Sequence, residues 1–142
     1  QQGPIMENNE LLTAILNFAL YFCISMVFLV VFKFAYALVT PHDEWQLIKE
    51  EKSVAAAIGF GGAIIGFSLA LASAANNSVS LIDFATWGVI ALIAQCFAFA
   101  LVRFGFMPRI VQRIEDNEIS AGIMLGVMNV AIGLLNAACM SY

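Results

Sequence analysis

The sequence predicts an all-α integral membrane protein with four transmembrane helices. Hydrophobic residues make up 62% of its 142 residues and charged residues 11%, against about 45–50% and about 25% in soluble domains. Four stretches contain no charge, and each reaches or nearly reaches the about 20 apolar residues that a helix needs to cross the hydrocarbon of a bilayer. These stretches are residues 11–32, 53–82, 84–102 and 119–142.

The N-terminal segment divides into two parts. Residues 1–5 contain Gly3-Pro4 after two glutamines, which is typical of a protease-site remnant of an expression tag. We therefore expect the natural chain to begin at Met6 and residues 6–142 to form a single transmembrane domain. The first span continues past Lys33, and a helix over residues 11–39 would be about 43 Å long, more than the about 30 Å hydrocarbon core. We expect this helix to tilt or to carry one end into the headgroup layer.

A short turn separates the second and third spans. It contains Asn76-Asn77-Ser78 and no charge. Ser80 and Asp83 then have the spacing of a capping box, in which each side chain satisfies a backbone N–H of the other's segment. This spacing predicts that the third helix begins next to Ser80.

The basic residues predict the orientation of the chain. All six lie in or beside the connector between the first two spans or the connector between the last two: Lys33, Lys49, Lys52, Arg103, Arg109 and Arg113. Cytoplasmic loops of membrane proteins carry an excess of basic residues. We therefore expect both connectors in the cytoplasm and both termini outside.

The chain partly matches itself when it is shifted by 67 residues. Eight of the 39 positions from Phe32 to Ala70 are identical to the residue 67 positions later, and Gly66, for example, falls on Gly133. The matches follow the order span, connector, span. They predict two parallel two-helix repeats, at about residues 8–75 and about 76–142, related by a pseudo-twofold axis along the membrane normal.

Both connectors have the pattern of short amphipathic helices. In the first, Thr40 and Pro41 are suited to begin a helix, and apolar residues alternate with charged ones. The second repeats this pattern around Ile110 and Ile114. We expect both to lie at the cytoplasmic membrane surface. Five residues are the candidates for contact with the interface or with lipid headgroups: Lys33, Trp45, Arg103, Arg109 and Arg113. For Lys33 and Arg103 the alternatives are snorkelling to the interface and binding of an anionic ligand.

Small residues follow one face of the second and fourth spans. Such rows let the backbones of membrane helices approach each other closely. The predicted helix-packing seam consists of Gly59, Gly62, Gly66, Gly122, Gly126 and Gly133. The alternative is that the seam lines a narrow polar path or a substrate pocket.

Four amide side chains lie within the spans, namely Asn17, Gln95, Asn129 and Asn136. An amide in hydrocarbon must find hydrogen-bond partners or lose several kcal/mol. The four therefore bond between helices, which contributes about 0.6–2 kcal/mol per contact, or they line a polar path. The sequence leaves both interpretations open.

Several function classes lack support in the sequence. It has no Ser/His/Asp set, no phosphate loop and no metal-ligand spacing, because His42 is its only histidine and its three cysteines lie apart within spans. The net charge of −4 leaves no basic surface for nucleic acid. We expect no enzymatic activity, no cofactor and no nucleic-acid partner.

Two segments resemble a known family. Trp45-Gln46-Leu47-Ile48-Lys49-Glu50, together with the glycine-rich stretch up to Phe67, is similar to the YjfL-like inner-membrane proteins, the family of domain of unknown function 350 (UPF0719). The C-terminal residues 133–142 resemble its most specific signature. The resemblance implies a four-span protein of the bacterial inner membrane without an established activity. Gene neighbourhoods in that family suggest a role in envelope maintenance or stress.

Two functional hypotheses follow. The first is a non-enzymatic membrane module in envelope maintenance or stress, whose connectors recruit a partner or sense the lipid surface. The alternative is a small channel or transporter with a path lined by glycine and asparagine. The candidate partners are the lipid bilayer, further copies of this chain, and a cytoplasmic or membrane protein.

Overall fold

The computed structural model describes residues 4–39, 44–106 and 108–140, and every element in this part of the chain is helical. The elements are α1 (Pro4–Val39), α2 (Glu44–Lys49), α3 (Val54–Asn77), α4 (Leu81–Leu101), the π-helix η1 (Val102–Phe106), α5 (Ile110–Glu115) and α6 (Ile119–Cys139). Four of them are long and apolar enough to cross a membrane, which confirms the predicted all-helical, four-span fold.

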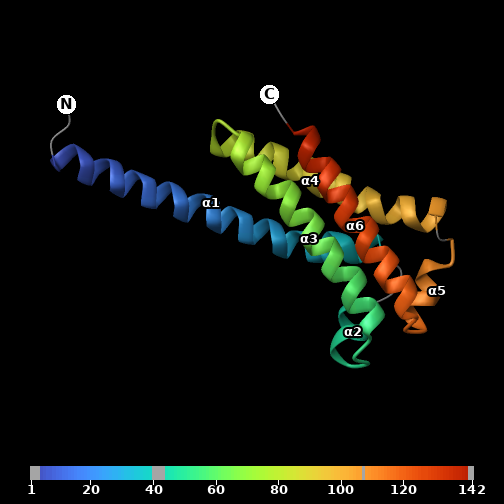
Figure 1. Cartoon of the computed structure of the whole chain (residues 1–142). Coiled ribbons are helices and arrows are strands. Elements are labelled where there is room, and N and C mark those ends of the chain that lie inside the picture. Colours follow the sequence, from blue (N-terminus) through green and yellow to red (C-terminus); the bar gives the residue numbers. More distant parts are fainter. Residues whose placement is uncertain (1–3, 40–43, 107, 141–142) are drawn as a thin grey trace.

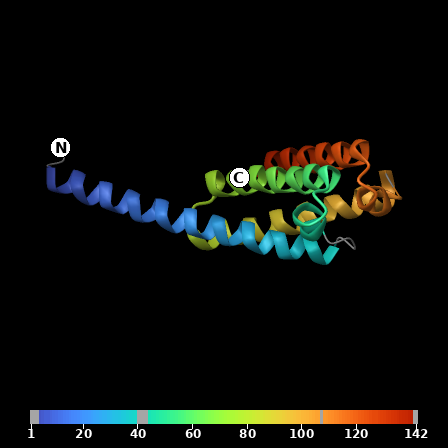
Figure 2. The same ribbon diagram turned by 90° about the horizontal axis from the view of Figure 1, so that it is seen from below.

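The four long helices form two parallel pairs. α3 and α6 run side by side in the same direction (Figure 1), and α1 and α4 lie on the other side of the bundle (Figure 2). α1 and α4 are also parallel, because Tyr21 contacts Phe84 near one end and Tyr36 contacts Phe99 near the other. Both connectors therefore lie at the same end of the bundle.

Two serines are the N-caps of α3 and α4. Ser53 is the N-cap of α3, and its Oγ accepts a hydrogen bond from the backbone N–H of Ala56. Ser80 is the N-cap of α4. Its Oγ accepts from the N–H of Asp83, while Asp83 accepts from the N–H of Val79. The predicted helix start at Ser80 is thus confirmed, whereas Asp83 bonds to the N–H of Val79 and not to that of the N-cap residue, as a capping box would require.

The connector helices α2 and α5 are attached to the bundle by their apolar sides. Leu47 is 7% exposed, and Ile110 and Ile114 are 0% exposed. These apolar side chains pack against protein, and the location of both helices at the cytoplasmic membrane surface stays a prediction. The proposed helix start at Thr40 and Pro41 lies outside the described residues.

The end of α4 differs from the expectation of a plain α-helix. The N–H of Val102, the last residue to bond into α4, donates to the carbonyl oxygens of both Ala98 and Phe99, and Val102–Phe106 then form a π-helix. Arg103 in this π-helix is half-buried.

Hydrogen bonds to Asn117 join the second connector to the start of α3. Asn117 has a left-handed backbone with φ of 55°, a conformation that asparagine tolerates better than most residues. Its Oδ1 accepts from the hydroxyl of Ser53 at 3.2 Å and from the N–H of Ala55 at 3.0 Å. Asn117, two residues before α6, therefore satisfies a backbone N–H in the first turn of α3 and joins these two helix starts.

Candidate functional site at the centre of the bundle

The six glycines of the predicted seam all lie where α3 meets α6. A methyl group on Gly122 would lie 2.5 Å from the carbonyl oxygen of Ala55, and one on Gly126 would lie 2.7 Å from that of Ile58. Gly62 faces the backbone of Gly126, and Gly133 faces the backbone of Gly66. Since backbone meets backbone, no side chain fits between the two helices at these positions.

Gly59 has a different role in the same seam. A methyl group on it would lie 2.8 Å from Cδ2 of Leu125, so this glycine makes room for a buried leucine. The seam as a whole is a packing surface, and α3 and α6 leave no open path along it.

A buried amide cluster lies beside the seam, where all four long helices meet. Gln95 of α4 donates from Nε2 to the backbone carbonyl of Asn129 in α6 at 2.8 Å. Asn129 donates from Nδ2 to the carbonyl oxygen of Gly59 in α3 at 3.1 Å and to the hydroxyl of Tyr36 in α1 at 3.2 Å. Gln95 and Asn129 are both 0% exposed.

The amide cluster has spare acceptors. Oε1 of Gln95 and Oδ1 of Asn129 are buried and have no hydrogen-bond partner. The N–H groups of both amides already point to oxygen atoms, so the orientation of each amide is fixed by its donors. The centre of the bundle therefore presents two carbonyl oxygens that can accept a hydrogen bond or bind a cation.

Aromatic rings enclose the amide cluster on the side of α1. Tyr36 packs against Phe32, Phe60 and Phe99 with ring centroids 5.4–5.7 Å apart. Phe32 in turn stacks on Phe67 at 4.7 Å. These rings exclude solvent from the amides, which strengthens the hydrogen bonds among them.

The other two predicted amides lie elsewhere. Asn136 is half-buried and donates to the carbonyl oxygen of Ala91 at 3.3 Å, so it joins α6 to α4. Asn17 is exposed on α1 and lies outside the amide cluster. The sequence does not predict Tyr36 as a partner of Asn129, because a tyrosine 93 positions away gives no local signal.

The predicted basic residues do not form one site. Lys33 lies over the ring of Phe34 at 4.6 Å, and Arg103 lies over that of Phe104 at 5.1 Å, which are cation–π contacts along their own helices. Arg109 is exposed. The side chain of Trp45 lies outside the described part of the structure.

Arg113 forms an ion pair with Glu118 at the start of α6. The hydrogen bond from Arg113 lowers the pKa of the Glu118 carboxyl, and the pKa of Arg113 is raised by the same bond. Both side chains are more than a third exposed, so the pair adds little to stability.

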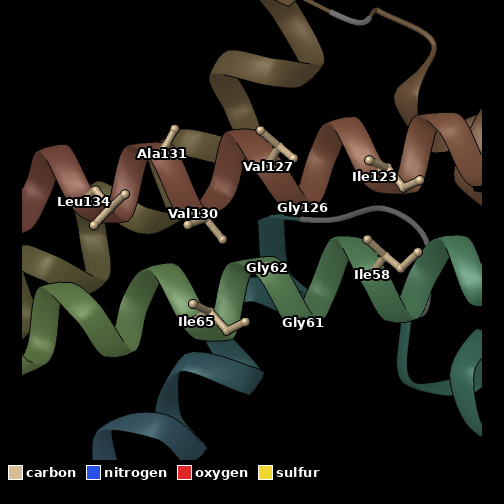
Figure 3. Close-up of a pocket in the computed structure, with 10 residues that line it drawn as sticks. All are labelled: Ile58, Gly61, Gly62, Ile65, Ile123, Gly126, Val127, Val130, Ala131 and Leu134. Atoms are coloured by element: carbon tan, nitrogen blue, oxygen red, sulfur yellow. The ribbon is translucent and has the colours of Figure 1, made fainter.

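An apolar groove of about 590 Å³ lies on the outer face of α3 and α6. Figure 3 shows Gly61, Gly62 and Gly126 at its centre, with isoleucine and valine side chains on both sides. It lacks polar side chains, so it is not the polar path that the sequence left open. A surface of this kind suits the acyl chains of lipids.

The described residues contain no cluster of side chains that could bind a metal ion. No group of three or more histidine, cysteine, aspartate or glutamate side chains gathers there. The cysteines Cys23, Cys96 and Cys139 are free thiols on three different helices.

Comparisons with known proteins agree with a membrane protein. A family model described as Domain of Unknown Function (DUF350) matches residues 10–140. The chain is 41% identical over 133 residues to the UPF0719 inner membrane protein YjfL of Escherichia coli (strain K12), which covers 94% of this chain and 99% of that protein.

A second relative is more distant. The chain is 26% identical over 126 residues to the UPF0719 transmembrane protein YshE of Bacillus subtilis (strain 168), covering 87% of this chain and 92% of that protein. No solved structure matches. Because the family model spans nearly the whole chain and the match to the Escherichia coli protein is nearly end to end, this chain belongs to the DUF350 (UPF0719) family.

Proposed function

We propose that this chain is a non-enzymatic module of the bacterial inner membrane that serves envelope maintenance or stress. In this proposal both termini lie outside, and the connectors α2 and α5 present a surface to a partner in the cytoplasm. The name of the Escherichia coli relative, an inner membrane protein, supports this location. The six basic residues at the connector end support the orientation.

The attachment of the connectors is the observation that carries this proposal. Leu47, Ile110 and Ile114 are buried against the bundle, and Asn117 joins the second connector to α3. The charged residues of both connectors are left on the outside: Lys49, Glu50, Glu51, Lys52, Arg109, Glu115, Asp116 and Glu118. A fixed surface of mixed charge suits recognition of a partner better than insertion into lipid.

We also propose that the fold arose from two parallel two-helix repeats. Two contacts of the seam join residues 67 positions apart, namely Ala55 with Gly122 and Gly66 with Gly133. Phe32 and Phe99, which the same shift relates, are both fully buried against Tyr36. A pseudo-twofold axis through the seam accounts for these pairs.

Photo-cross-linking in living cells tests the connector surface. With p-benzoylphenylalanine at Glu50 and, separately, at Gln112, we expect the same protein to be captured, because both positions are exposed and belong to the two connectors at the same end of the bundle. The control position is Val79, which is 87% exposed at the opposite end. Capture should fall several-fold when Arg109 is changed to glutamate. The same products from Val79, or none from either connector, would contradict the proposal.

A small channel or transporter is the second candidate function. The specific observation in its favour is the pair of unpartnered carbonyl oxygens on Gln95 and Asn129 at the meeting point of the four helices. Carbonyl oxygens can replace the hydration shell of a cation. Transport would require α3 and α6 to separate, because the seam is closed in this structure.

Flux into liposomes tests the second candidate. Purified protein is reconstituted, and uptake of sodium, potassium and a polyamine is compared with that of Asn129→Leu and of protein-free liposomes. The module hypothesis expects uptake at the protein-free level for both proteins. Uptake by the parent that Asn129→Leu abolishes, while this variant still elutes as a single folded species, would favour transport instead.

A further inference from the structure

We draw no further inference here: the strongest candidate, the apolar groove of about 590 Å³ on the outer face of α3 and α6, carries none because nothing in the described part of the chain shows what covers it.

Discussion

Replacing Gly66 or Gly133 by leucine should lower the free energy of unfolding by about 1–3 kcal/mol, because each change forces a side chain into a well-packed contact. Gly133 faces the backbone of Gly66, and Gly66 also meets the backbone of Asn129 and the side chain of Gln95. Backbone atoms cannot move aside as a flexible side chain can. The two helices would have to separate, and the amide cluster would lose its geometry with them.

Gly61 provides the matched control on the same helix. It directly precedes the seam residue Gly62, but a methyl group there would meet nothing within 4 Å, because it opens into the apolar groove. Gly61→Leu should therefore change stability by less than about 0.5 kcal/mol apart from the gain in helix propensity. Unfolding in a detergent mixture, followed by circular dichroism, measures all three variants. Equal midpoints for Gly61→Leu and Gly66→Leu would show that the seam does not hold the bundle together.

The glycine seam could be predicted from the sequence because its information is local. Spacing of three and four residues places small side chains on one face of a helix, and a glycine within a membrane span serves mainly to let another backbone approach. The shift of 67 residues then aligns α3 with α6. The same shift does not predict every contact between the two helices, because it pairs Gly62 with Asn129, whereas Gly62 contacts Gly126 in the structure.

The amide cluster could be predicted only in part. The cost of burying Gln95 and Asn129 in hydrocarbon requires partners, but does not say which. Tyr36 is a partner because α1 meets the bundle from Tyr21 onwards. Asn17 lies before that point and is exposed, and hydrophobicity alone does not reveal where on a long apolar helix the contacts begin.

The packing of the connectors could also be predicted only in part from the sequence. Amphipathic spacing predicts that Ile110 and Ile114 leave water, and they do. The same spacing does not distinguish a lipid surface from the side of a bundle, because both offer apolar contact. The π-helix at Val102–Phe106 likewise has no signature in the sequence.

Ile114→Asp should unfold the connector end, with a loss of about 3–5 kcal/mol, because an unpaired charge would be buried there. Ile114 is 0% exposed, and aspartate is too short to reach water as lysine could. Glu115 and Asp116 follow it directly, and Arg113, which precedes it, is already paired with Glu118.

The control is Gln112→Asp, which adds the same charge two positions away on an exposed site of α5. It should leave the unfolding midpoint and the amount of protein in the membrane nearly unchanged. The comparison also distinguishes two causes of lost partner capture, namely unfolding of the connector and damage to the partner surface. If a charge at position 114 abolishes partner capture, the cause is loss of the folded connector, whereas a defect in Gln112→Asp at normal protein levels reports on the partner surface itself. Equal stability of the two variants would mean that α5 is not held by its buried isoleucines, and the fixed connector surface on which the proposed function depends would then be lost.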